Sequence, residues 1–181
     1  ALLRKKSKIS LVHSEWGPRG LLQFYKDGED GTLYTMINSK VLFFNQEKEN
    51  SWRGIPFNDR SKIRKTLYEY ILKDNKRKSV FIGVGGLKSF THVDKKLLNK
   101  NVYAIELLEG VVSFFSDKYK GTRDIANDIQ YVAKEGRAYL SGLSDQEAHA
   151  IAFESSFFQA SEHNLYTRKL KPNYLFSPQT I

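Results

Sequence analysis

A glutamate stands inside the apolar stretch SDQEAHAIAFESSFFQASEH, residues 144–163, and is the residue best placed for chemistry. The Ser144 to Glu147 spacing is that of a capping box, which predicts a helix beginning at Ser144. At helical spacing Glu154 shares one broad arc with Ala150, Ile151, Phe153, Phe157 and Phe158. A carboxylate there is costly unless it is paired, protonated or at the rim of a cleft. Glu154 is therefore predicted to be a general base or a metal ligand, with a structural ion pair to an arginine as the alternative.

The stretch EHNLYTRK, residues 162–169, adds an imidazole, a phenol and a fixed cation. Metal-independent cleavage of a phosphodiester needs a base, an acid and a cation for the charge that develops on phosphorus. His163 and Tyr166 have the chemistry for proton transfer, and Arg168 could hold phosphate. The alternative for His163 is an ordinary residue at a helix C-terminus, where the helix dipole favours it.

A histidine and a carboxylate also alternate near the N-terminus, in LVHSEW. On a strand, His13 and Glu15 point to the same face, and such a pair can orient an imidazole for catalysis. His13 is therefore a further catalytic candidate. The alternative is a pair of polar neighbours on a solvated strand face.

Positive charge is the strongest global feature. The 181 residues hold 29 Lys and Arg against 20 Asp and Glu, a formal net charge of +9 with a pI near 9.6. Such a charge favours a polyanionic partner, nucleic acid first and an anionic membrane surface or acidic protein next, although a basic protein without such a partner remains the alternative. The residues assigned to nucleic-acid binding are Arg53, Lys62, Arg64, Lys65, Lys76, Arg77, Lys78 and Lys88.

The glycine-rich stretch GVGGLKS, residues 83–89, follows an apolar run. It is not a P-loop, because Leu87 stands where GxxxxGK[ST] needs glycine, and it does not meet the GxGxxG spacing either. Glycines after a strand can still form a nest of amides for an anion, with Lys88 adding charge. The alternative is a tight turn without a ligand.

The stretch SWRGIPF, residues 51–57, resembles the arginine strand of ADP-ribosyltransferases. The resemblance implies that Arg53 would hold NAD. The sequence departs from that family because no Ser-Thr-Ser strand and no E/Q-x-E pair follow. The resemblance is confined to Arg53 and its neighbours, and no family is assigned.

The predicted secondary structure changes along the chain from strands alone to a mixture of helices and strands. β-branched and aromatic runs in the first third, separated by glycine-rich turns, predict an antiparallel meander. Residues 58–74 predict a helix capped by Asn58, and residues 79–86 a buried strand. We expect two strands about Glu109 and Gly110, although Leu107, Leu108, Val111, Val112 and Phe115 would also suit a helix. A helix from Thr122 to Gly136 and the helix from Ser144 are expected to follow. The expectation is a single α+β domain over 1–181, a twisted, mainly antiparallel sheet packed by about three helices, with a flexible basic arm at 1–8 and tail at 177–181.

Composition excludes several classes of site. The chain has no cysteine, so it forms no disulfide or thiolate metal site. No run of about 18 apolar residues is present, and the N-terminus has no signal-peptide pattern, so we expect a cytoplasmic protein or one exported without a visible signal. No metal or cofactor is expected.

The sequence is interpreted as a nucleic-acid-acting enzyme, a small metal-independent nuclease of toxin or restriction type in which Glu154 and His163 transfer protons. The alternatives are a non-catalytic nucleic-acid-binding or assembly protein and an NAD-dependent ADP-ribosyltransferase-like enzyme that uses Arg53 and Glu154.

Overall fold

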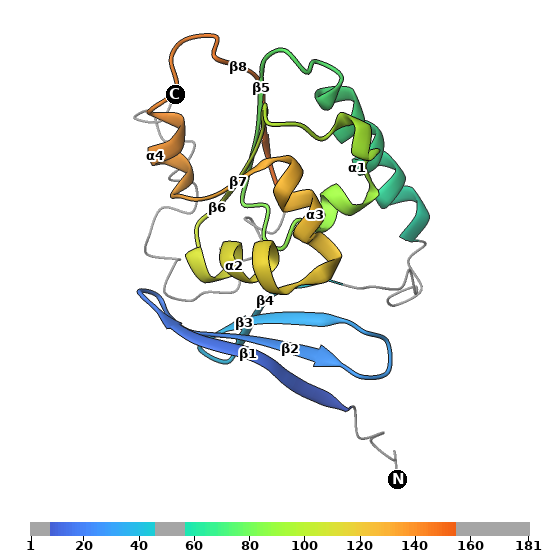
Figure 1. Ribbon diagram of the computed structural model, residues 1–181, viewed down its shortest axis with the longest axis vertical. Helices are drawn as coiled ribbons and strands as arrows, with labels where there is room; N and C mark the ends of the chain where they lie inside the picture. Colours follow the sequence, from blue (N-terminus) through green and yellow to red (C-terminus); the bar gives the residue numbers. More distant parts are fainter. Residues whose placement is uncertain (1–7, 46–56, 155–181) are drawn as a thin grey trace. The chain divides into compact units, whose positions relative to one another are not determined.

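A computed structural model describes residues 8–45 and 57–154, and the chain divides into two compact units, Ala1–Phe57 and Asn58–Ile181 (Figure 1). Among the described residues, no helix is long and apolar enough to cross a membrane.

The first unit is a four-stranded antiparallel sheet in the order β1-β2-β3-β4. Its strands are β1 Ile9–Gly17, β2 Gly20–Asp27, β3 Leu33–Ile37 and β4 Lys40–Asn45. Asn38 and Ser39 connect the last two strands with φ of 49° and 65°, the left-handed pair that a two-residue hairpin turn requires. The side chain of Asn38 accepts a hydrogen bond from the Leu21 amide at 3.0 Å, which ties this turn to β2. The meander predicted for the first third is present.

The second unit is built on a four-stranded parallel sheet in the order β7-β6-β5-β8. Helical segments separate its strands along the chain. The elements are α1 Phe57–Leu72, β5 Lys78–Ile82, η1 Lys88–His92, η2 Lys95–Leu97, β6 Val102–Glu106, α2 Glu109–Ser113, η3 Phe114–Lys118, α3 Lys120–Asp128, β7 Gln130–Ala133, α4 Gly136–Leu140 and β8 Ala148–Phe153.

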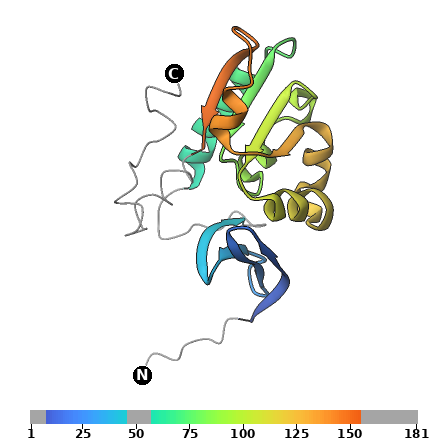
Figure 2. The same cartoon turned by 90° about the vertical axis from the view of Figure 1, so that its left-hand side faces the viewer.

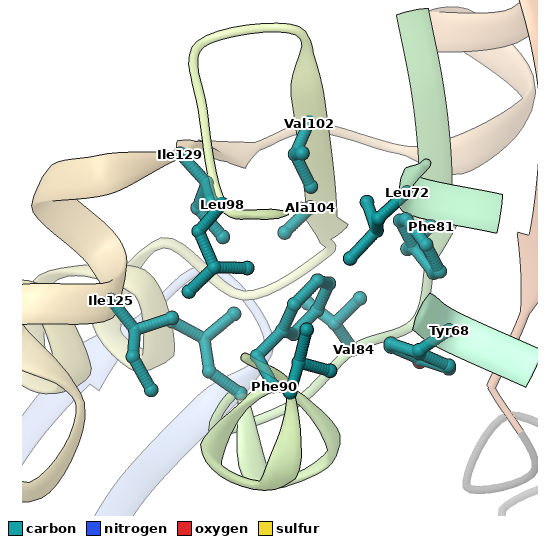
Figure 3. Close-up of a cluster of buried hydrophobic side chains, with 12 residues drawn as sticks. Tyr68, Leu72, Phe81, Val84, Phe90, Leu98, Val102, Ala104, Ile125 and Ile129 are labelled. Carbon is teal, nitrogen blue, oxygen red and sulfur yellow. The ribbon is translucent and has the colours of Figure 1, made fainter. Parts of the chain in front are cut away.

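Hydrophobic side chains pack on both faces of this sheet. Alternate residues of a strand point to opposite faces, so each strand contributes to both layers. Phe81 of β5 packs against the rings of Tyr68 and Phe90 at centroid distances of 4.6 and 5.1 Å (Figure 3). Its neighbours Val80 and Ile82 enter the opposite layer. A strand buried on both faces therefore appears in the sequence as a continuous apolar run and does not alternate.

The predicted fold class is wrong, because the larger sheet is parallel and its strands alternate with helices. The error arose in the second half of the chain. Residues 148–153, predicted to lie in a helix, form β8, and the end of the helix predicted from Thr122 is β7. Conversely, the second strand expected after Glu109 is the helical run of α2 and η3. Short apolar runs of this kind have no period that separates a buried strand from a buried helix.

The two elements predicted nearer the start of this unit are confirmed. The helix expected over 58–74 is α1, and the buried strand expected before the glycines is β5. The predicted cap is wrong, because α1 begins at Phe57 and Asn58 therefore lies inside the helix.

Candidate functional site at the carboxyl edge of the parallel sheet

The parallel sheet has a topological switch point at β5. The chain passes from β5 to β6 and then to β7 on one side, whereas β8 pairs with the other side of β5 (Figure 2). In open parallel sheets, ligands bind in the crevice at the carboxyl ends of the strands where the order reverses. The residues that follow β5, β6 and β8 are therefore the first candidates for a site.

A glycine loop follows β5 at this edge. The amide of Gly83 donates to the carbonyl of Ile105 at 2.8 Å, so the loop begins beside the end of β6. Gly83 and Gly85 have φ of 74° and 52°, a region that favours glycine. Leu87 also has a positive φ, 59°, and its side chain is fully buried. The glycines are required by the backbone path that the loop takes across the end of β5.

Glu106, the last residue of β6, holds this loop with its carboxylate. One oxygen, Oε2, accepts from the Gly85 amide at 2.9 Å. The other, Oε1, accepts from the amides of Leu107 and Leu108 at 2.9 and 3.2 Å. Burial raises the pKa of Glu106, and these three amide donors oppose that shift. Glu106 therefore joins the loops after β5 and β6.

Tyr131 of β7 holds the same residue, Gly85, through its carbonyl group. Its hydroxyl donates a hydrogen bond to the carbonyl of Gly85. Burial, and then the negative charge of Glu106, raise the pKa of Tyr131 well above its usual value, so the phenol stays protonated and remains a donor. The peptide groups on either side of Gly85 are thus fixed by side chains from two neighbouring strands.

We expect Tyr131→Phe to lower the free energy of unfolding by about 1 kcal/mol, because it leaves the Gly85 carbonyl without this donor. Urea unfolding followed by circular dichroism measures the change. Tyr70→Phe is the matched control, since Tyr70 is 75% exposed on α1 and should have no measurable effect. Equal stability of Tyr131→Phe and the parent protein would show that the phenol does not support the loop.

Glu154 lies directly after β8, beside the end of β5. Its amide donates to the carbonyl of Ile82 at 3.0 Å, and its side chain is 9% exposed. Its Oε1 has no hydrogen-bond partner among the residues that the structure describes. Burial raises the pKa of Glu154 to about 7, while the positive charge of Arg64 opposes the shift. The predicted mid-helix position is therefore corrected to the carboxyl edge of the sheet, where a proton-transfer role remains a proposal.

One of the predicted cations, Arg64, lies close enough to act on this carboxylate, and a second, Lys88, lies near Arg64. Nη1 of Arg64 donates to the hydroxyl of Ser89 at 3.3 Å, and Ser89 follows Lys88 immediately after the glycine loop. Burial lowers the pKa of Lys88, and the charge of Arg64 lowers it further. The charge of Arg64 therefore acts on both Lys88 and Glu154.

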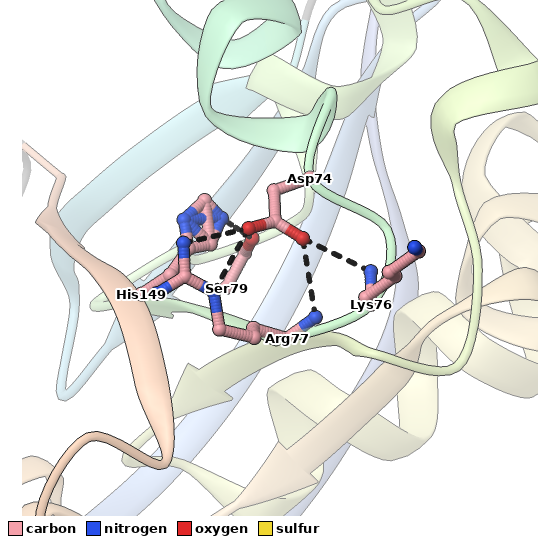
Figure 4. Close-up of polar contacts among 5 residues, drawn as sticks. All are labelled: Asp74, Lys76, Arg77, Ser79 and His149. Carbon is pink, nitrogen blue, oxygen red and sulfur yellow. Dashed lines mark hydrogen bonds and ion pairs between the residues drawn. The ribbon is translucent and has the colours of Figure 1, made fainter.

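The other predicted cations are spread over the surface. Lys62 is exposed, and Lys65 lies 3.8 Å from the carboxylate of Glu69. Lys76 and Arg77 follow Asp74, which pairs with Arg77 at 2.8 Å (Figure 4). Lys78 pairs with Glu147 and lies over the ring of Tyr103, 5.0 Å from its centroid.

Two histidines have polar partners in the structure. Nε2 of His13 lies 2.9 Å from Oε2 of Glu15, as expected for two residues on one strand face, within the first unit. His149 lies in β8 with Nε2 3.0 Å from the hydroxyl of Ser79 (Figure 4). Four of the predicted site residues lie outside the described part of the chain, and their roles stay predictions: Arg53, His163, Tyr166 and Arg168.

Glu106 and Tyr131 were missed by the sequence analysis, although one signal pointed to Glu106. In dinucleotide-binding folds an acidic residue follows the glycine loop by about 20 residues, at the end of the next strand. Glu106 has that spacing from Gly85, but the glycine stretch departs from GxGxxG, so the motif did not indicate such a fold. Tyr131 has no comparable signal, because its contact with Gly85 depends on the pairing of strands far apart in the sequence.

Comparisons with known proteins agree with this topology. No protein-family model matches the chain, and no curated protein matches it significantly. A spermidine synthase from Thermotoga maritima superposes with a TM-score of 0.56 and 16% identity over 81% of this chain and 47% of that one. A spermidine synthase in complex with the transition-state analogue AdoDATO gives 0.56 and 16% over 82% and 48%. The chain therefore shares the Rossmann-like fold of these synthases, and it spans about half of their length.

This likeness overturns the predicted function. The neighbours are spermidine synthases, so the prediction of a small nuclease of toxin or restriction type, a hydrolase, is wrong. The alternatives of an ADP-ribosyltransferase and of a nucleic-acid-binding protein are not retained. Nothing in the comparisons supports a nucleic-acid partner.

Proposed function

We propose that the second unit binds an adenosine-containing donor at the switch point and transfers a group from it to an amine. The observation that carries this proposal is Glu154, a buried carboxylate beside the end of β5 whose Oε1 has no hydrogen-bond partner within residues 8–45 and 57–154. The names of the structural neighbours, spermidine synthases, supply the class of reaction.

The residues at the edge fit a nucleoside better than a phosphate. The Gly85 amide, which a phosphate would need, already donates to the carboxylate of Glu106. Two further carboxylates follow β7 and β8, at Glu135 and Glu154. Carboxylates accept hydrogen bonds from hydroxyl and amino groups and attract cations, whereas they repel phosphate. The edge therefore suits ribose hydroxyls and a positively charged donor.

Glu106 and Glu154 have distinct roles in this proposal. When bound, the donor supplies an electrophilic carbon next to a positively charged sulfur. Glu106 fixes the glycine loop and keeps further lone pairs available to hydroxyl groups. Glu154 accepts the proton that the attacking amine releases, for which a pKa of about 7 is suitable because both forms are populated near neutral pH.

Isothermal titration calorimetry tests the binding step. We expect S-adenosylmethionine and 5′-methylthioadenosine to bind, and ATP and NAD to bind at least about tenfold more weakly, because their phosphates face the carboxylate edge. Tighter binding of ATP or NAD than of both nucleosides would contradict the proposal.

Mass spectrometry tests the transfer step. The protein is incubated with an adenosyl sulfonium and a panel of diamines, and the amines are examined for an added alkyl group. We expect one amine to gain mass only when the protein is present. Nucleoside binding without transfer to any amine, under conditions where the donor is stable, would reduce the proposal to a binding site.

A further inference from the structure

The first strand of the first unit forms an open edge. Among the described strands β1 pairs only with β2, and it lies at the border of the sheet (Figure 1). An unpaired edge exposes a row of backbone donors and acceptors that another strand can use. Proteins protect such edges with proline or lysine in the strand or with a β-bulge. β1 has a register shift between Leu11 and His13, but its nine residues include no proline and no lysine.

The side chains along this edge are largely apolar. Ile9, Leu11 and Val12 are about half-exposed, and Trp16 is 79% exposed. Apolar side chains that gather at an unpaired edge are typical of a surface that pairs with another chain. The edge of β1 is therefore a candidate interface.

The register shift determines which residues of β1 share a face. Ser10 lies opposite Lys26, whereas His13 lies opposite Phe24. Lys26 and Phe24 are alternate residues of β2 and point to the same side of the sheet, so Ser10 and His13 do so as well. The shift thus places residues on one face although they are three positions apart.

Lys8 and Glu15 place opposite charges on this face, near the two ends of the edge. Lys8 lies two residues before Ser10, and Glu15 lies two residues after His13, as the alternation of a strand requires. The Lys8 carbonyl accepts from the Gly28 amide at 3.1 Å, so the pairing with β2 continues to Lys8. Oε2 of Glu15 lies 2.9 Å from Nε2 of His13, and the other carboxylate oxygen can accept from a further donor.

We infer that β1 pairs antiparallel with β1 of a second copy of this chain, so that the two four-stranded sheets join into one. In the register that aligns residue 10 of one copy with residue 13 of the other, Lys8 of each copy lies opposite Glu15 of the other. Two-fold symmetry thus makes two cross-strand ion pairs from the same two residues, an isologous contact. The other edge strand, β4, lacks this complementarity because it contains Lys40 and no acidic residue. The inference does not depend on the proposed function.

Sedimentation velocity of the full chain over a concentration series measures the dissociation constant of this dimer. The variants are Lys8→Glu, Glu15→Lys and the double exchange of both. Lys40→Glu is the matched control, because Lys40 is exposed on β4 and its substitution changes the net charge as much as Lys8→Glu does. Thermal melts verify that each variant is folded. Lys8→Glu decides alone if Glu15→Lys is not folded, since Lys8 is exposed and precedes the strand.

We expect the parent protein to dimerise and each single variant to raise the dissociation constant about tenfold or more, because like charges then lie opposite each other at two places. The double exchange, and an equimolar mixture of the two single variants, should restore the dissociation constant to within about threefold of the parent value. Lys40→Glu should leave it unchanged. A parent protein that stays monomeric, or a dimer that Lys8→Glu weakens no more than Lys40→Glu does, overturns the inference. So does a double exchange that does not restore the dimer.

Discussion

Glu154→Gln is expected to lower the rate of group transfer by about 10² to 10⁴, the usual contribution of a general base. Glutamine keeps the size of the side chain but cannot accept a proton. The affinity for the nucleoside donor should change by less than about threefold, since in this proposal Glu154 faces the amine. Steady-state kinetics and calorimetry on the same preparation separate the two effects. A rate that remains at the parent level would exclude Glu154 as the base.

The same substitution should stabilise the protein at high pH. Burial raises the pKa of Glu154 to about 7 from 4.5, so the folded state holds a proton that the unfolded state has released. Stability therefore falls as pH rises from about 4.5 to about 7, by on the order of 3 kcal/mol in total. Glu154→Gln has no carboxylate to ionise, so its free energy of unfolding should exceed that of the parent protein by that amount at pH 8. At pH 4 the two proteins should have similar free energies of unfolding.

Urea unfolding at the two pH values distinguishes this result from a structural ion pair. If Glu154 were held as an anion by an arginine, the glutamine variant would be less stable at pH 8. In that case Glu154 would have a structural role in the second unit and not a catalytic one.

The pH dependence of turnover offers a third measurement on the same group. A base with a pKa of about 7 is half-deprotonated at that pH, so kcat/KM should rise with pH up to about 7 and level off above it. A rate that is flat from pH 5 to 9 would mean that Glu154 does not accept the proton.

Glu154 was selected from the sequence for a reason that does not depend on secondary structure. A carboxylate among apolar residues is unusual on a buried helix and at the end of a buried strand alike. The prediction of a helix was wrong. Residues 148–153, AHAIAF, form β8, which pairs with β5 and is apolar like the other strands of a parallel sheet. The Ser144 to Glu147 contact was still correct, since the Ser144 amide and hydroxyl both donate to Glu147 at 2.9 and 3.0 Å, but without a helix.

The prediction of a nucleic-acid partner, which rested on net charge, shows that net charge does not identify the ligand of a binding site. Charge governs association and solubility, and it does not identify the groups that meet at one edge of a sheet. In the structure Arg77 and Lys78 pair with acidic neighbours, whereas the edge itself carries Glu106 and Glu154. Lys78 and Glu147 are far apart in the sequence, as are the strands that end beside Glu106 and Glu154, so the sequence alone could not place these residues in space.

Glu106→Ala is expected to lower both stability and nucleoside affinity. It removes the acceptor of three amides, and the Gly85 amide is buried where water cannot replace the carboxylate. An unsatisfied buried donor costs about 1–3 kcal/mol, and the loss of the other two bonds adds to it. Urea unfolding measures the stability, and calorimetry with 5′-methylthioadenosine measures the affinity at a temperature where the variant is folded.

Glu109→Ala is the control for this substitution, because Glu109 is exposed and lies three residues further along the chain. It should leave the nucleoside affinity unchanged. Loss of stability without loss of affinity in Glu106→Ala would mean that Glu106 only holds the loop. Loss of affinity beyond that of Tyr131→Phe, which disturbs the same loop from the other side, would indicate a direct contact between Glu106 and the nucleoside. The two variants together therefore separate support of the glycine loop from recognition of the donor.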